Sequence, residues 1–203
     1  MTVHKGQRWG APGALPAQGV VVRSDAEARA VVTAARRSGE PVPPLGLLGG
    51  DLCRTLGGPG DENRLRSPEA VTVSCDLGSV LLDGRLQFFL AHLVARKHWW
   101  GSKVFVAMNA AWWGPWNLGP RAHPGDGLLD TYEARLPLRQ ALQVRARLPT
   151  GSHLPHPNIR ERRTKAVQID LGGPVPVVLD GQSVGTAQAL SLRVETDAVT
   201  VVV

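Results

Sequence analysis

The sequence predicts a mostly β protein of the α+β class, with a small N-terminal strand–helix–strand unit followed by an antiparallel β-sandwich. A chain of 203 residues suits one domain, or one domain with a small appendage. A segment of helical apolar spacing lies between two short apolar runs, and from residue 69 apolar and polar residues alternate between Gly and Asp-Gly turns. We therefore expect a reduced α/β N-terminal lobe with an irregular arm over residues 1–66 and a β-sandwich domain over residues 67–203.

The N-terminal unit has its own start and stop signals. The run GVVV (19–22) is typical of a short buried strand, and LGLL (45–48) of a second one. Between them, Ser24 and Glu27 form a capping-box pattern and Gly39 is a typical helix end. A strand–helix–strand succession of this length is the kind that makes parallel strand pairs.

The remainder of the chain is expected to be strands joined by short turns, with one helix. The helix is predicted over 137–148, where a first-turn proline precedes residues at helical spacing. The predicted strand segments lie within 70–94, 103–110, 127–136, 165–171, 175–181, 189–195 and 198–203. Closely spaced strands with turn residues between them favour a sandwich of antiparallel sheets.

Charge and cysteine content limit the classes of partner and compartment. The chain has 23 Lys+Arg against 17 Asp+Glu, a formal charge of +6 and a sequence pI near 10.1, which favours anionic partners or serves only solubility. Cys53 and Cys75 have neither metal-site spacing nor a disulfide framework, which indicates a reducing compartment. No signal peptide and no transmembrane run of 18 apolar residues is expected. The expected location is the cytoplasm, with peripheral attachment to a membrane as an alternative.

Aromatic and basic residues gather in the middle of the sequence. Five of the six tryptophans lie within 18 residues: Trp99, Trp100, Trp112, Trp113 and Trp116. They either pack into the core and sheet or form an amphipathic rim at a lipid or ligand surface. In the second case Arg96, Lys97 and Lys103 would suit anionic headgroups. The basic run RERRTK (160–165) is either a solvated strand or loop, or a patch that faces phosphate.

Four segments resemble, in order, the diacylglycerol kinase catalytic family of bacterial lipid kinases, whose superfamily includes the NAD kinases. They are PPLGLLGGDLCRTLGGP (43–59), CDLG (75–78), AMNAAWWGPWNLGPRAHPGDGLLD (107–130) and VVLDGQSVG (177–185). The resemblance covers roughly residues 40–203. It implies an α/β lobe with a Gly-Gly-Asp-Gly-Thr loop for ATP phosphates, a C-terminal β-sandwich, and a cleft in which a lipid hydroxyl is phosphorylated with Mg²⁺.

The resemblance assigns catalytic roles to three positions. Asp51 is similar to an aspartate that belongs to an aspartate–water–magnesium network. Asp180 and Gln182 match the first and third positions of the family's Asp-Gly-Glu turn, whose glutamate takes the proton of the lipid hydroxyl. Gly49 and Gly50 fall in the phosphate-holding loop.

The resemblance also implies a structural Mg²⁺ site. Asp126 matches the aspartate of the Asp-Gly-Leu-Leu-Asp turn, and the carbonyls of His123 and Leu128 would be its companions. These are the oxygen ligands that Mg²⁺ prefers.

Departures from the family pattern favour a truncated and divergent member. No Gly-Gly-Asp-Gly-Thr string occurs, and the Pro-x-Gly-Thr segment before Asp51 is deleted, so backbone amides and a hydroxyl that cradle phosphate are missing. Gln182 cannot act as a general base, a loss that typically costs on the order of 10²–10⁴ in rate. Mg²⁺ stays a candidate cofactor, whereas ATP is not expected.

Three hypotheses follow. The first is a catalytically degenerate lipid kinase-like protein that binds a lipid, an anionic ligand or membrane surface, or a protein partner, a second copy included. The second is an active ATP-dependent lipid phosphotransferase with an altered site, which needs Asp51, Asp126 and Asp180 together in a cleft. The third is a structural, partner-binding β-sandwich. A nucleic acid partner is not expected.

Overall fold

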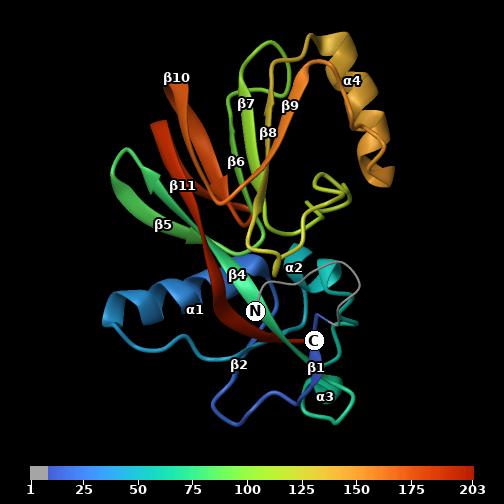
Figure 1. Cartoon of the computed structure of the whole chain (residues 1–203), viewed down its shortest axis with the longest axis vertical. Coiled ribbons are helices and arrows are strands. Elements are labelled where there is room, and N and C mark those ends of the chain that lie inside the picture. Colours follow the sequence, from blue (N-terminus) through green and yellow to red (C-terminus); the bar gives the residue numbers. More distant parts are fainter. Residues whose placement is uncertain (1–8) are drawn as a thin grey trace.

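A computed structural model describes residues 9–203 and places eleven strands in one sheet, with four α-helices around it (Figure 1). The strands are β1 (Ala11–Pro12), β2 (Val20–Val22), β3 (Leu45–Leu47), β4 (Val71–Leu82), β5 (Arg85–Phe89), β6 (His92–Arg96), β7 (Val104–Met108), β8 (Leu129–Ala134), β9 (Ile159–Thr164), β10 (Ala166–Leu179) and β11 (Gln182–Val202). The helices are α1 (Asp25–Ser38), α2 (Gly50–Thr55), α3 (Glu62–Leu65) and α4 (Leu138–Arg147), followed by the 3-10 turn η1 (Leu148–Thr150). An irregular arm was expected at the N-terminus. Its residues 1–8 lie outside the described residues. Ala11–Pro12 form the short strand β1, which pairs with β4.

The predicted N-terminal strand–helix–strand unit is confirmed as β2, α1 and β3. The Ser24 hydroxyl accepts the Glu27 N–H at 3.2 Å and caps α1 at its start. Gly39 ends the helix with a φ of 74°, a left-handed conformation that favours glycine. β2 and β3 are parallel, and β3 also pairs in parallel with the C-terminal end of β11. This last pairing joins the unit to the main sheet.

Two long antiparallel strands, β4 and β11, run from the sandwich into the N-terminal unit (Figure 1). Their pairing extends from Leu82 opposite Leu190 to Thr72 opposite Val202. The division expected between residues 66 and 67 falls in the connection from α3 to β4 and stays a prediction, because β11 returns from the second part into the first. The two largest hydrophobic cores of the described chain therefore share residues of these two strands.

The mostly β fold with an antiparallel sheet is confirmed. Beyond β11 the strand order continues as β10, β6, β7, β8 and β9. The sheet folds over, so that a core of side chains from β4, β5 and β11 packs against side chains of β6, β7 and β8. Phe89 and Phe105 lie at its centre and are fully buried. The four strands expected at the C-terminus are instead two, because the irregularities between Asp170 and Val175 and between Glu195 and Val199 are shifts in register and not turns.

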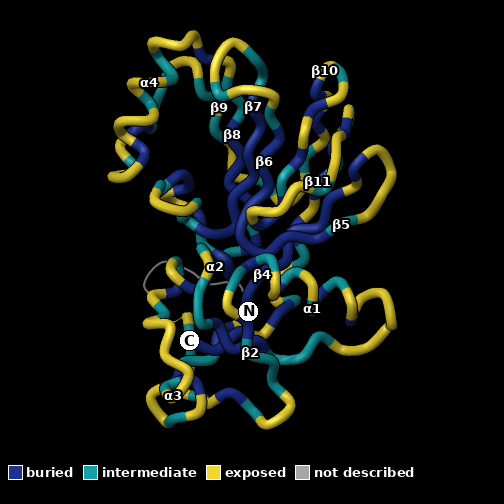
Figure 2. Tube along the Cα trace, turned by 180° about the vertical axis from the view of Figure 1, so that it is seen from behind, coloured by how far each residue is buried: buried dark blue, intermediate teal, exposed yellow. Residues whose placement is uncertain are grey.

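The helix predicted over 137–148 is confirmed as α4, which lies at the end of the molecule remote from α1–α3 (Figure 1). None of its residues is buried, and its outer face is exposed throughout (Figure 2). The basic run 160–165 forms most of β9, an edge strand beside β8. Within residues 9–203 no helix combines the length and the apolar character needed to cross a membrane.

Candidate functional site

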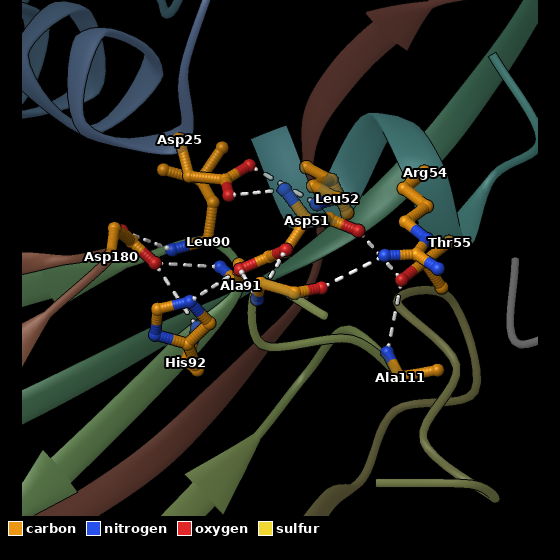
Figure 3. A network of polar contacts seen from close by, with 11 residues as sticks. Asp25, Asp51, Leu52, Arg54, Thr55, Leu90, Ala91, His92, Ala111 and Asp180 are labelled. Atoms are coloured by element: carbon orange, nitrogen blue, oxygen red, sulfur yellow. Dashed lines mark hydrogen bonds and ion pairs between the residues drawn. The ribbon is translucent and has the colours of Figure 1, made fainter. Parts of the chain in front are cut away.

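Four ionisable side chains converge where the N-terminal unit meets the sandwich: Asp25, Asp51, His92 and Asp180 (Figure 3). Asp25 begins α1 directly after β2, and Asp51 lies in the first turn of α2 directly after β3. Because β2 and β3 are parallel, both helices begin at the same edge of the sheet, which is where α/β folds place ligands. His92 begins β6, and Asp180 lies in the turn from β10 to β11.

The carboxylate of Asp25 occupies the N-terminus of α2. It accepts the backbone N–H groups of Asp51 at 2.6 Å and Leu52 at 3.1 Å, and the cap residue Gly49 supplies no side chain of its own. Gly50 has a φ of 95°, and a Cβ there would lie 2.5 Å from Asp25 Oδ1. Gly50, one of the two glycines predicted to bind phosphate, thus leaves room for an internal carboxylate. An external anion would have to displace it.

Asp51 and His92 form a buried pair. His92 Nε2 lies 3.0 Å from Asp51 Oδ2, and the Gly114 N–H donates to the same carboxylate at 2.9 and 3.1 Å. Burial raises the pKa of Asp51, but the hydrogen bonds from His92 and Gly114 outweigh it and hold the pKa below its usual value. Burial lowers the pKa of His92, whereas the bond to Asp51 and the charge of Asp180 raise it, and the net pKa is raised. The hydrogen bond between the two side chains thus favours the charged form of each.

Asp180 is held in place by three backbone amides. Its carboxylate accepts the N–H groups of Leu90, Ala91 and His92 at 2.9, 2.8 and 3.1 Å. Its backbone has a φ of 49° in the hairpin turn, which points the side chain toward the β5–β6 connection. Burial raises the pKa of Asp180, and burial together with the charge of Asp180 raises the pKa of Asp25 to about 6.

Gln182, the residue at the position of the family's base, lies at the exposed edge of this cluster. Its Oε1 accepts from Arg29 Nη2 at 2.7 Å, and Arg29 Nε lies 4.0 Å from Asp180 Oδ2. The structure therefore brings Asp51, Asp180 and Gln182 into one cluster. Asp126, which the altered active site also requires, belongs to a second cluster around Arg163. The catalytic roles of Asp51, Asp180 and Gln182 stay predictions.

Sequence reasoning missed three members of this cluster. Asp25 looks like an ordinary acidic residue in the first turn of a capped helix, His92 lies inside the apolar run FFLAHLV, and Arg29 looks like a solvated helix residue. The signal that could have found Asp25 is its place directly after a strand, which matches the place of Asp51 after the next strand.

Asp25, Asp51 and His92 could offer three atoms within 4.8 Å of one another to a cation. Both oxygens of Asp25 already accept backbone N–H groups, and those of Asp51 accept from His92 and Gly114. Protein donors thus compensate the negative charge of this cluster.

The predicted Mg²⁺ ligand Asp126 belongs to a second cluster, where a guanidinium lies against its carboxylate. Arg163 Nη2 pairs with Asp126 Oδ2, and Arg163 Nε donates to Asp130 Oδ1 at 2.9 Å. Asp126 Oδ1 accepts the Leu128 N–H at 3.0 Å, and the Asp126 N–H donates to the His123 carbonyl at 3.4 Å. Within the described chain, only Asp130 Oδ2 among these carboxylate oxygens has no hydrogen-bond partner. Mg²⁺ needs about six oxygen ligands, so the residues do not fit it while Arg163 is in place.

The tryptophans divide between the two interpretations left open by the sequence. Trp99, Trp113 and Trp116 pack against one another and against the core that contains Val106 and Tyr132. Trp100 is 50% exposed at the β6–β7 connection. Packing is therefore confirmed for these three tryptophans, and the rim at a lipid or ligand surface stays a prediction.

The chain resembles known proteins in sequence pattern and in fold. The pattern of the YegS C-terminal NAD kinase beta sandwich-like domain matches residues 79–203, more than half of the chain. Among curated protein sequences there is no match. Two solved structures of a candidate diacylglycerol kinase from Bacillus anthracis str. Sterne have TM-scores of 0.69 and 0.63 with 14% and 13% identity, each over 91% of this chain and 77% of the other. A diacylglycerol kinase structure from the same organism has a TM-score of 0.55 with 16% identity, over 79% of this chain and 66% of the other.

Proposed function

Because the chain belongs to the family of YegS C-terminal NAD kinase beta sandwich-like domains, we propose that it is a lipid kinase-like protein that binds an anionic lipid surface and does not transfer phosphate. Its fold is similar to that of diacylglycerol kinases, whose name specifies a lipid substrate. The loss of phosphate transfer is supported by the first cluster, and the lipid surface by the α4 end of the molecule.

The occupied N-terminus of α2 is the observation that supports the loss of phosphate transfer. Free N–H groups at a helix N-terminus attract phosphate because they are unpaired and carry partial positive charge. Here Asp25 pairs with those of Asp51 and Leu52, and its own negative charge repels an incoming phosphate. Gln182 adds a second loss, since a carboxamide cannot take the proton of a lipid hydroxyl.

The α4 end combines exposed apolar side chains with basic ones, and this combination supports lipid binding. Leu138 and Leu142, one helical turn apart, are 51% and 57% exposed, and Trp100 lies at the same end. Residues 135–160 contain five arginines and no aspartate or glutamate. An amphipathic surface with leucine, tryptophan and arginine lies in the plane of an anionic membrane. We call these three side chains with α4 the α4 surface.

Two assays test the proposal. Labelled ATP with Mg²⁺ and dispersed diacylglycerol should give no phosphatidate, and product above the level of a heat-treated sample would refute the loss of phosphate transfer. In a flotation assay the protein should bind vesicles of phosphatidylcholine with about a third phosphatidylglycerol, and bind far less to phosphatidylcholine alone or at high salt.

A matched pair of variants locates the contact. The double variant Leu138→Ser/Leu142→Ser should bind the anionic vesicles about tenfold more weakly, because two leucines no longer enter the interface. The control is Leu86→Ser, since Leu86 is 54% exposed but lies on β5. Equal binding by the double variant and the wild-type protein would refute the α4 surface as the contact.

A further inference from the structure

His153 is a buried ionisable residue in the wall of an apolar cavity. The cavity has a volume of about 120 Å³ and lies between α4 and the strands β7, β8 and β9. Aliphatic and aromatic side chains form most of its wall, among them Val104, Val106, Leu118 and Ile159. His153 is 3% exposed, and its Nδ1 atom has no hydrogen-bond partner in the described chain. A proton from solvent would therefore bind at this nitrogen.

The groups around the cavity provide no negative charge for an imidazolium. Apart from His153 itself, Arg145 of α4 and the aliphatic and aromatic residues make up the wall, and no aspartate or glutamate of the described chain lines it. Burial raises the pKa of the Tyr132 hydroxyl on β8, so this group is neutral near pH 7. On β9, Glu161 pairs with Arg121 instead. A charged His153 would lie in an apolar wall without a counter-ion, a position that strongly disfavours charge.

The pKa of His153 is consistent with this geometry. Burial lowers it, a hydrogen bond with the Leu118 backbone raises it, and the neighbouring His156 lowers it, with a net decrease. In an opened segment the imidazole would regain its ordinary pKa of about 6.5. The closed form thus binds fewer protons than the open form, so a fall in pH through about 6.5 favours opening.

The segment that carries α4 is attached to the sheet mainly at its C-terminal side. None of the residues of α4 is buried. Leu148 of η1 is buried, and the partly buried Val144 and Leu154 pack against the same core. The Leu148 carbonyl also accepts the Asn117 N–H at 3.0 Å. His153 lies among these attachment points, so a charge on its imidazole acts where the segment is held.

We propose that His153 is an acid-sensitive switch: when its imidazole takes up a proton, α4 and residues 148–158 separate from β7 and β8. The separation needs no lipid. It exposes the cavity wall next to the α4 surface, so more apolar area becomes available to an anionic membrane. Only this consequence for membrane binding rests on the proposed function.

Hydrogen exchange of the whole chain, read by mass spectrometry, measures the separation without vesicles. Exchange at pH 7.5 and 5.0, corrected for the intrinsic rate at each pH, gives the protection of peptides from residues 135–158. Their protection should fall about tenfold at pH 5.0, since one unit of pKa difference corresponds to a tenfold change in the equilibrium. Peptides of β4 and β11 should not lose protection. Equal protection of residues 135–158 at both pH values would overturn the inference.

A matched pair of variants assigns the effect to His153. Glutamine can donate a hydrogen bond to the Leu118 backbone but binds no proton, so His153→Gln should have the same protection at both pH values. The control is His156→Gln, because His156 lies in the same loop, does not line the cavity and accepts the Asn158 N–H at 3.1 Å. This control should keep the loss of protection seen in the wild-type protein. A His156→Gln protein without the loss would overturn the assignment to His153.

The wild-type protein alone decides the question if His153→Gln does not fold. In an NMR titration the imidazole of His153 should titrate below its ordinary pKa of about 6.5. The indole signal of Trp116, which lines the cavity, should shift with the same midpoint. An imidazole that titrates at or above 6.5 would overturn the switch, because the closed cavity would then favour the charged form.

Flotation with anionic vesicles at both pH values separates the switch from the proposed function. The wild-type protein should bind more strongly at pH 5.0, and His153→Gln should show a smaller increase, since only the other histidines gain charge. Loss of protection without vesicle binding at either pH would refute the lipid-surface function alone. Vesicle binding without loss of protection would refute the switch alone. In global unfolding the lowered pKa of His153 opposes the raised pKa of Asp25, so each variant is compared with the wild-type protein at the same pH.

Discussion

The junction between the N-terminal unit and the sandwich differs from the α4 end of the molecule in how its polar groups are paired. At the junction of the N-terminal unit and the sandwich, Asp25, Asp51 and Asp180 each accept hydrogen bonds from backbone amides or from His92. At the α4 end, leucines are exposed on a helix without buried residues, and two buried polar atoms have no partner in the described chain.

This contrast indicates where a ligand is needed. In the junction, the carboxylates of Asp25 and Asp180 already accept the nearby backbone amides, so an added anion gains little there. At the α4 end, a ligand or a surface would complete contacts that the chain leaves open. The family fold is thus retained, whereas the contacts that a ligand could complete lie at the α4 end and not in the junction. Each prediction below tests one of these two regions.

The largest expected effect is that of Asp180→Ala. The substitution leaves the buried N–H groups of Leu90, Ala91 and His92 without an acceptor, so we expect a loss of about 3–5 kcal/mol in the free energy of unfolding, measured by denaturant titration. Asp83 is the matched control: it also lies in a hairpin turn with positive φ and accepts two amides, but at an exposed position. Asp83→Ala should cost about 1 kcal/mol. Equal losses would contradict the view that the junction is held together by buried carboxylates.

Next in size is Asp25→Ala. Without the carboxylate, α2 loses its only N-terminal cap, and loss of a cap costs about 1–2 kcal/mol. Asp61 caps α3 through the Asn63 N–H at an exposed position, so Asp61→Ala should cost less than Asp25→Ala in the same thermal melts. A loss at Asp61 that exceeds the loss at Asp25 would mean that Asp25 is not the residue that fixes α2.

Sequence reasoning predicted the periodic elements well and the contacts between distant segments poorly. The start of α1 was predictable because Ser24, Glu27 and Gly39 act locally, over three or four residues. The position of Asp180 next to His92 was not, because it depends on long-range strand pairing between β10 and β6. The C-terminal strands were divided too often because glycines at 172 and 173 mark a bulge as readily as a turn. In the candidate site, the resemblance supplied Asp51, Asp180 and Gln182, but Asp25 and His92 carry no local pattern.

A third, smaller effect concerns pH. The pKa of Asp25 is raised to about 6 in the folded state from 3.8, and that of His92 is also raised, so the folded protein binds more protons than the unfolded one between pH 4 and 7. The free energy of unfolding should therefore increase as the pH falls from about 7.5 to 5.5, by on the order of 1 kcal/mol. The depressed pKa of Asp51 acts in the other direction, but only below its unfolded value of 3.8. Burial also raises the pKa of Asp76 and of Asp130 to about 6, so these groups contribute to the same slope. Asp25→Ala should therefore reduce this pH dependence without abolishing it, and an unchanged slope would show that the other groups cause it.

The smallest expected effect is that of Mg²⁺ on the wild-type protein. Arg163 already supplies positive charge to Asp126 and Asp130, so a cation would have to displace a guanidinium that makes two contacts with carboxylates. Adding Mg²⁺ or a chelator should therefore leave the wild-type melting temperature unchanged. Arg163→Ala should lower it and make it rise again with millimolar Mg²⁺, because two carboxylates would then face each other without a cation.

Arg121→Ala is the control for the magnesium prediction. Arg121 pairs with Glu161 at the same edge of the sheet, but it makes no contact with Asp126. Its loss should leave the protein insensitive to Mg²⁺. A wild-type protein that is itself stabilised by Mg²⁺ would contradict this prediction, because it would mean that an ion binds although Arg163 already pairs with Asp126 and Asp130.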